Sequence, residues 1–93
     1  MKLEEHCCRS LSLFGDEFRE VHIWLDEYFS TLGARHRRKR HHLKGIEEAR
    51  ILFGDRGAEV AKQHILDDLM GEGWQNGDHF PADEADYVRM GLF

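Results

Sequence analysis

The sequence has little cysteine, a single proline and no long apolar run. Its two cysteines are neighbours, Cys7 and Cys8, so they form neither a disulfide framework nor a spaced zinc motif, and we expect free thiols. No stretch reaches the roughly 20 apolar residues that span a bilayer, and the first residues lack the apolar segment of a signal peptide. These absences predict a cytoplasmic protein without membrane attachment.

Alternating strand patterns and internal repeats are also missing. Apolar residues instead recur every three or four positions, which is typical of helices. The length of 93 residues provides for one domain, 1–93, and a hydrophobic content of 41% suffices for a core. The sequence therefore predicts a single all-α domain, a compact bundle of about four helices.

Glycines mark the ends of the predicted helices. These are three long helices over about 16–33, 34–53 and 57–70, and shorter ones over 3–14 and 82–90. Gly33, Gly54 and Gly71 follow the long helices as expected for C-terminal caps. Residues 71–80 form a glycine-rich loop, after which Pro81 begins the last helix.

The seven histidines are many for a chain of 93 residues. His22 and Asp26 stand four residues apart, and His64 and Asp68 repeat that step, so each pair consists of neighbours on its helix. In the helix predicted over 34–53, His36 and His42 are expected to point toward the core, whereas His41 is expected to point almost the opposite way. Three helices would thus each bring a histidine toward the interior.

Imidazole nitrogens and carboxylate oxygens are favoured ligands of zinc and other divalent transition metals. We therefore expect a site for zinc, manganese or iron whose ligands are His22, His36, His42, His64 and Asp68. Asp26 would orient a ligand or act as a general base. The alternative is that each histidine–aspartate step is an ordinary surface pair, which stabilises a helix by roughly a few tenths of a kcal/mol.

Basic residues are concentrated in one stretch, since six of the 13 lie within residues 35–44, although the net charge is −5. Cations at the N-terminus of a helix oppose its dipole, so the stretch disfavours the helix predicted there. Contact with nucleic acid or another polyanion would explain why basic residues are concentrated here. Arg37, Arg40 and Lys44 would then be the phosphate-binding side chains. The alternative is a solvated helix start, because no aromatic residue is interleaved to stack on bases.

Two apolar residues, Ile23 and Trp24, lie off the buried stripe of their predicted helix. They either cover a second neighbour in the core or form the contact surface of a homo-dimer.

The order of these residues resembles a family of small phage and bacterial proteins known as a domain of unknown function. The resemblance covers about residues 6–90, and its most specific part is Arg-His-Arg followed by Arg-His-His. The motifs are His6, His22-Ile-Trp-Leu-Asp26, Arg35-His-Arg37, Arg40-His-His42, Gly45-Ile46, Phe53-Gly54, Gln63-His64 and Asp68-Leu69. The resemblance implies that His6 joins the cluster and favours His36, His42, His64 and Asp68 as members. The chain departs from the family at Cys7-Cys8 and in a shorter link between Phe53 and Gln63.

Two functions fit these patterns. In a metal-dependent phosphoester hydrolase, the cluster holds the ion, Asp26 is the general base, and Arg37 and Arg40 grip phosphate oxygens. In a non-enzymatic accessory module, the basic stretch binds nucleic acid or a host protein and the cluster is structural. A pH sensor is a third hypothesis, because clustered histidines titrate near neutrality.

Overall fold

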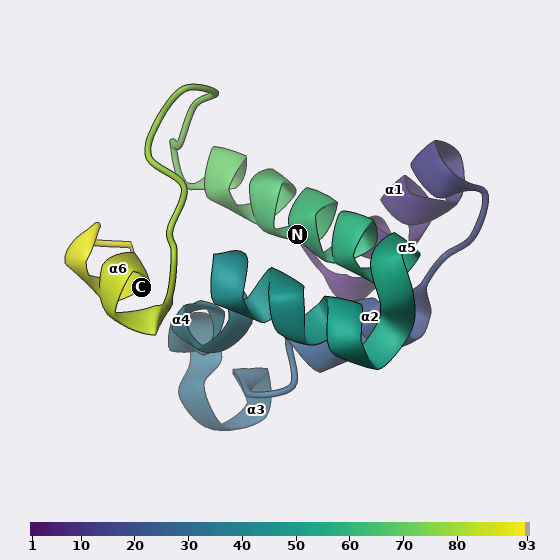
Figure 1. Cartoon of the computed structure of the whole chain (residues 1–93), viewed down its shortest axis with the longest axis horizontal. Helices are drawn as coiled ribbons and strands as arrows, with labels where there is room; N and C mark the ends of the chain where they lie inside the picture. Colours follow the sequence, from purple (N-terminus) through teal and green to yellow (C-terminus); the bar gives the residue numbers. More distant parts are fainter. Residues whose placement is uncertain (93) are drawn as a thin grey trace.

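Helices form the regular secondary structure of residues 1–92, the part of the chain that the computed structural model describes (Figure 1). They are α1 (Leu3–Phe14), α2 (Arg19–Leu25), α3 (Phe29–Leu32), the 3-10 helix η1 (Gly33–His36), α4 (Arg37–Arg40), α5 (Leu43–Gly71) and α6 (Glu84–Arg89). No strand occurs in this range, which confirms the predicted compact all-α bundle. None of these helices is long and apolar enough to cross a membrane.

The long helix α5 is broken at Gly54, which has φ 81° and ψ −176°. The chain reverses its direction there, as the teal and green halves of α5 show in Figure 1. Three residues later, a Cβ on Gly57 would lie 2.3 Å from the Cβ of Phe53, so the turn leaves room only for glycine. The predicted helix end near Phe53 is confirmed, whereas the second half of α5 resumes directly after Gly54 rather than at Gly57.

The shorter predicted helices are also present. Residues 3–14 form α1, which ends on Gly15 with φ 80°. The last helix, α6, begins at Glu84 rather than at residue 82, because the Asp83 side chain accepts a hydrogen bond from the Asp86 N–H and so caps the helix there. The glycine-rich loop precedes it, as predicted.

The prediction of one continuous helix over 16–33 is wrong. α2 begins only at Arg19, after Phe18 with φ 49°, and it ends at Leu25. Asp26 leaves the helical conformation, with φ −102° and ψ 13°, and its carboxylate meets buried histidines from other parts of the chain. Tertiary contacts of a buried charge here outweigh the local preference for helix.

The prediction of one continuous helix over 34–53 is also wrong. η1 and α4 end at Arg40, and α5 begins at Leu43 with His42 as its N-cap. The first amides of α5 are satisfied from outside the helix, because Leu43 and Lys44 donate to the carbonyls of Pro81 and Ala82. The segment before α6 thus fixes the start of α5, and His41 becomes a linker residue.

An apolar core lies between α2, α5 and α6. Its buried members are Val21, Leu25, Ile46, Ala49, Ala58, Val60, Ala61, Ile65, Leu69 and Tyr87. Trp24 packs at its edge with its ring 5.9 Å from that of Phe53, so this tryptophan covers a core neighbour. Ile23 is 52% exposed. Cys7 is buried, Cys8 is exposed, and both are free thiols.

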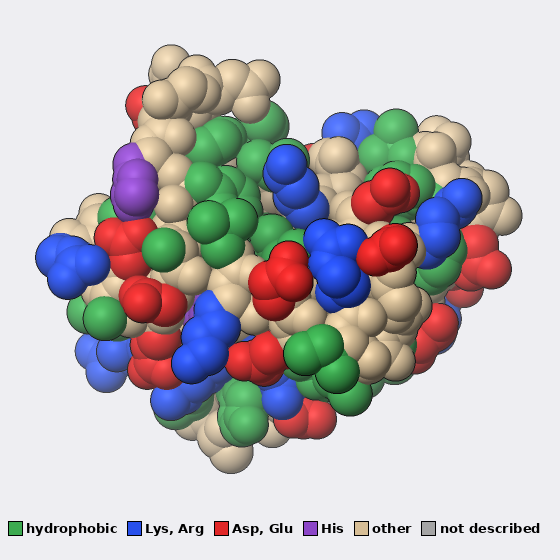
Figure 2. All heavy atoms as spheres, viewed as in Figure 1, with side chains coloured by type: hydrophobic (Ala, Val, Ile, Leu, Met, Phe, Trp, Pro, Cys, Tyr) green, Lys and Arg blue, Asp and Glu red, His purple; other side chains and the backbone are tan. Residues whose placement is uncertain are grey.

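The basic stretch does not form an isolated cationic patch. Arg37 pairs with Glu72, and Arg40 lies 3.1 Å from Glu27. Lys39 lies 3.4 Å from Glu84 on α6. Figure 2 shows basic and acidic side chains interspersed over one face of the molecule. Acidic residues distant in sequence therefore neutralise much of the charge that the sequence concentrates in residues 35–44.

A substitution at Gly45 tests the packing at the start of α5. A Cβ at this position would lie 1.8 Å from the backbone oxygen of Arg40. We expect Gly45→Ala to lower the free energy of unfolding by about 2–3 kcal/mol in urea denaturation, because the backbone has to move. Gly71→Ala is the control, since its Cβ meets nothing within 4 Å, and it should change stability by less than about 1 kcal/mol. Equal stability of the two variants would contradict this packing.

Candidate metal centre

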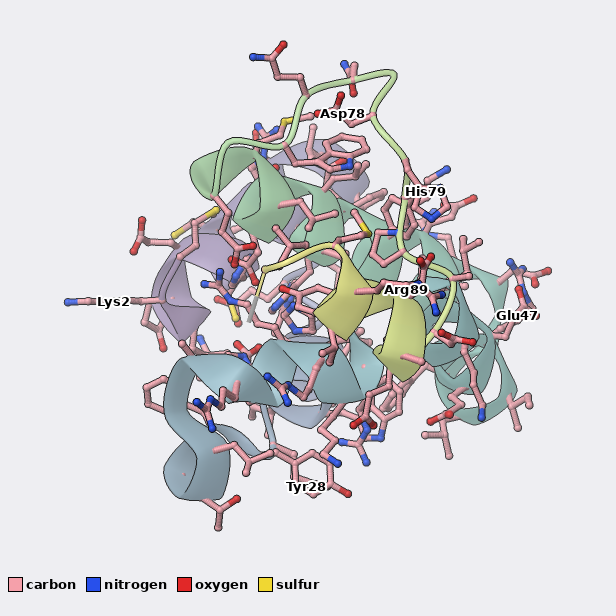
Figure 3. The ribbon with its side chains drawn as sticks, turned by 90° about the vertical axis from the view of Figure 1, so that its left-hand side faces the viewer. Lys2, Tyr28, Glu47, Asp78, His79 and Arg89 are labelled. Carbon is pink, nitrogen blue, oxygen red and sulfur yellow. The ribbon has the colours of Figure 1, made fainter. Side chains whose placement is uncertain are left out.

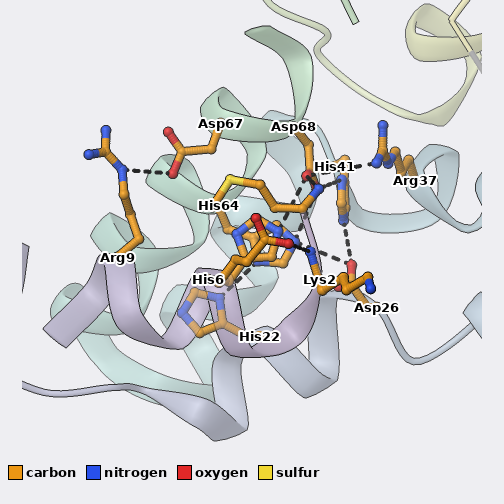
Figure 4. Close-up of polar contacts among 12 residues, drawn as sticks. Lys2, His6, Arg9, His22, Asp26, Arg37, His41, His64, Asp67 and Asp68 are labelled. Atoms are coloured by element: carbon orange, nitrogen blue, oxygen red, sulfur yellow. Dashed lines mark hydrogen bonds and ion pairs between the residues drawn. The ribbon is translucent and has the colours of Figure 1, made fainter. Parts of the chain in front are cut away.

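The interior contains a polar cluster beside the apolar core. Six of the seven histidines are buried, and only His79 is exposed. Five of the six come together with two aspartates, as most of them do in Figure 4. The members are His6, His22, Asp26, His36, His41, His64 and Asp68.

Separate elements bring these side chains together. His6 comes from α1, His22 from α2 and Asp26 from the residue that ends α2. His64 and Asp68 lie one turn apart on the second half of α5, and their facing atoms are 3.2 Å apart. The break between α4 and α5 places His41 in the same space, between the two carboxylates.

Four of the residues are arranged like the ligands of one ion. His64 Nε2 is 3.2 Å from Asp26 Oδ1 and 3.2 Å from Asp68 Oδ2. His41 Nε2 is 3.3 Å from Asp26 Oδ1. Two ligand atoms bound at about 2.0–2.1 Å to one tetrahedral zinc stand roughly 3.3 Å apart. The rings of His41 and His64 are nearly perpendicular, at 86°, so their lone pairs can converge on one point.

Several nitrogens in this cluster are buried without a hydrogen-bond partner among residues 1–92. They are Nδ1 and Nε2 of His6 and Nε2 of His41, of which the two Nε2 atoms lie 3.3 Å from Asp68 Oδ1 and Asp26 Oδ1 without the alignment of a hydrogen bond. Leaving a buried polar group unsatisfied costs about 1–3 kcal/mol. Proteins seldom retain such groups unless they serve a function or bind something. A cation between the two carboxylates would satisfy His41 Nε2 and offset the negative charge.

A second group of potential ligands, His6, His22 and His64, shares His64 with the first. Its geometry suits an ion less well. The rings of His6 and His64 are stacked, with centroids 3.6 Å apart and planes 12° apart. Because a nitrogen lone pair lies in the plane of its ring, two parallel rings cannot both direct lone pairs at one ion. The group of Asp26, His41, His64 and Asp68 is therefore the better metal site.

His22 lies behind His64 rather than in the ligand group. The Nδ1 atoms of the two rings are 2.8 Å apart, and Nε2 of His22 is 2.7 Å from the hydroxyl oxygen of Ser10. When His64 Nε2 is unprotonated, its Nδ1–H donates to His22 Nδ1, and His22 Nε2–H donates to Ser10. Such a chain fixes the tautomer and orientation of a metal-binding imidazole.

His36 supports Asp26. Its Nδ1–H donates to the Gly33 carbonyl at 2.7 Å, and its Nε2 is 2.9 Å from Asp26 Oδ1. Both ring nitrogens thus face oxygen atoms. His36 lies outside the four-residue group and holds the Asp26 carboxylate in place.

Burial keeps two of the imidazoles neutral. It lowers the pKa of His22 to about 3, with His64 and His6 adding to the effect. It also lowers the pKa of His41 to about 4, although the close contact with the Asp26 carboxylate opposes this change. Neutral imidazoles are the form that binds metal ions.

The two carboxylates stay charged in spite of burial. Burial acts to raise the pKa of Asp26, but hydrogen bonds with His36 and His64 and the close contact with His41 outweigh it and hold that pKa well below its usual range. Contacts with His6 and His64 have the same effect on the pKa of Asp68. Burial likewise acts to lower the pKa of His64, whereas the two aspartates raise it.

The structure separates the other predicted site residues from this cluster. His42 is buried at the start of α5, where its Nδ1 accepts from the Gly45 N–H and its Nε2 lies 3.1 Å from the Arg38 carbonyl oxygen. Arg40 lies over the rings of Trp24 and Tyr28, at 4.2 and 4.9 Å from their centroids.

The other two predicted phosphate-binding residues, Lys44 and Arg37, lie in different surroundings. Lys44 lies near Glu48 and Asp83, at a different surface from the cluster. Arg37 alone of the three basic residues adjoins the cluster, with its guanidinium 3.8 Å from Asp68.

Helical periodicity gave the wrong orientation for His41, which is fully buried in the cluster instead of pointing away from the core. The break between α4 and α5 changes its direction, and a continuous helix would not. Periodicity also missed Ser10 and His6. The resemblance implied His6, but it favoured the neighbouring His42 rather than His41.

A pocket of about 550 Å³ opens beside the cluster. Its lining includes Asp26, Asp68, His22, His36 and Arg37. Asp26 is the more exposed of the two carboxylates, with 25% of its side chain accessible against 4% for Asp68. The candidate site thus has a solvent-accessible face, which a catalytic metal site requires.

The comparisons with known proteins place the chain in a family without an assigned activity. A family model described as a domain of unknown function (DUF6915) matches residues 1–89. The chain belongs to this family. No curated protein and no solved structure matches it. The expected resemblance to a family of unknown function is thereby confirmed, and the chemistry has to be inferred from the site itself.

Acid should destabilise this protein. The pKa of His22 and that of His41 lie below the value of 6.5 expected in the unfolded chain, so the unfolded state binds more protons as the pH falls below about 6.5. The raised pKa of His64 opposes this trend, but burial also lowers the pKa of His42, so three histidines act against one. We expect the melting temperature, measured with a chelator present, to fall by roughly 10 °C or more between pH 7 and pH 4.5. A constant or rising melting temperature would contradict the burial of neutral histidines.

Proposed function

We propose that this protein binds one divalent transition metal ion, zinc, manganese or iron, through Asp26, His41, His64 and Asp68, and uses it to hydrolyse a phosphoester. The buried nitrogens without hydrogen-bond partners, beside two charged carboxylates, carry the first part of this proposal. The pocket that opens onto the same cluster carries the second part.

A cluster held only by hydrogen bonds explains the geometry less well. Its key contacts, at 3.2–3.3 Å, are longer than the range for charge-assisted hydrogen bonds, about 2.7–2.9 Å, and near the spacing of ligands around one ion. A pure hydrogen-bond network would also be expected to align His6 and His41 with the carboxylates, and ring nitrogens of both form no hydrogen bond in the described chain.

Hydrolysis fits the distribution of groups around the pocket. A bound divalent ion polarises a phosphoryl oxygen and lowers the pKa of a coordinated water. His36, His41 and His64 all approach Oδ1 of Asp26, so Oδ2 is the atom of that carboxylate that takes a proton from the attacking water. Arg37, which Glu72 holds in place, contacts the phosphate.

The alternative of an accessory module that binds nucleic acid or a host protein through its basic stretch has less support. Arg37, Lys39 and Arg40 each pair with a glutamate of this chain. A polyanion would have to displace these partners before binding.

Metal binding is tested by titrating the metal-free protein, without a histidine tag, with Zn²⁺ and Mn²⁺ in a calorimeter. We expect one ion per chain and a rise in melting temperature on binding, because a ligand of the folded state stabilises it. Asp68→Asn and His41→Gln should each weaken binding by about 100-fold or more, since each removes a ligand.

The chain provides a matched control for this titration. His79 and Asp86 form a histidine–aspartate pair at 2.6 Å outside the cluster, and Figure 3 shows His79 at the surface. Asp86→Asn and His79→Gln should bind the ion as the wild type does. Equal losses in the cluster and control variants, or no binding by the wild type, would refute the metal site.

Turnover is tested with bis(p-nitrophenyl) phosphate and p-nitrophenyl phosphate. We expect hydrolysis that requires the added ion. Asp26→Asn should reduce its rate by about 100-fold or more, because the substitution removes the general base and a metal ligand at once. Asp86→Asn serves again as the control. A protein that binds the ion in stoichiometric amount but hydrolyses neither ester faster than the free ion would overturn the hydrolase and leave the metal site standing.

A further inference from the structure

We propose that the pocket beside the cluster selects a phosphate monoester with one apolar group, a small amphipathic substrate rather than a nucleic acid. This inference rests on the proposed function, because the phosphate is held by the bound ion. The pocket volume of about 550 Å³ lies in the range of about 300–1,000 Å³ that small-molecule sites occupy.

The pocket lining combines two kinds of side chain. Cluster residues and Arg37 would receive the phosphate. Leu3, Ile23 and Phe29 add apolar surface to the same pocket. A ligand with an anionic group and an apolar group would match both.

The apolar surface is exposed without contributing to the core. Ile23 is 52% exposed and Phe29 is 61% exposed, and neither belongs to the buried core. The rings of Phe29 and His36 are nearly perpendicular, with centroids 5.5 Å apart, and His36 in turn holds Asp26. This phenylalanine therefore stands directly beside the proposed reaction centre, where an organic group attached to the phosphate would lie.

Charge around the opening is mixed rather than uniformly basic. Glu27, which pairs with Arg40, lines the pocket together with Lys2 and Arg37. A nucleic acid would need cations for several phosphates, whereas a monoester places its single phosphate at the ion and Arg37. The apolar side chains of the lining, Leu3, Ile23 and Phe29, suit one organic group.

A pair of unreactive phosphonates tests the selection. Methylphosphonate and phenylphosphonate carry the same anionic group and differ only in the apolar one. We expect the zinc-loaded wild type to bind phenylphosphonate about 10-fold or more tightly than methylphosphonate in calorimetry, because the ring loses apolar surface to the pocket. Ile23→Asn should reduce this ratio to about 3 or less without changing the metal stoichiometry.

Ile51→Asn is the matched control, since Ile51 is 83% exposed on α5 and does not line the pocket. It should keep the wild-type ratio. If the protein binds zinc and methylphosphonate but shows no preference for the ring, or if Ile51→Asn loses the preference as Ile23→Asn does, the inferred selection is wrong and the metal site stands. If the protein binds no zinc, the proposed function and this inference fail together. Tighter binding of a short oligonucleotide than of phenylphosphonate would show that the substrate is a polymer.

Discussion

Two buried carboxylates impose the constraint on which this small fold depends. Taking a carboxylate out of water costs several kcal/mol unless opposite charge or hydrogen bonds compensate. Here imidazoles from different parts of the chain supply the compensation around Asp26 and Asp68. The positions at which two helices end follow from this requirement. The chain leaves the helical path at Asp26 and again at His41, because both side chains have to reach the same point.

The cluster also ties the domain together. It joins α1, α2, the link before α5 and the second half of α5, so its members meet across most of the sequence. A chain of 93 residues buries a modest core, and such small domains often rely on a bound metal for stability. The same ion that would serve a reaction would therefore cross-link the fold.

The sequence predicted the helical class, the break near Gly54 and the glycine-rich loop, because these depend on local patterns. The two four-residue steps, His22–Asp26 and His64–Asp68, likewise directed attention to residues that meet in space. The orientation of His41 was not predictable from periodicity. It depends on a helix break that tertiary hydrogen bonds create, when the carbonyls of Pro81 and Ala82 take the first amides of α5. A local pattern contains no information about partners forty residues away.

The most direct test of the central claim is X-ray absorption spectroscopy of the zinc-loaded protein. The account predicts nitrogen and oxygen ligands at about 2.0–2.1 Å, with the multiple-scattering signature of two imidazoles and without sulfur. His22→Gln should keep two imidazoles, whereas His41→Gln should leave one. A shell at about 2.3 Å, which is the zinc–sulfur distance, would instead place the ion on Cys7 or Cys8 and contradict the histidine–aspartate site.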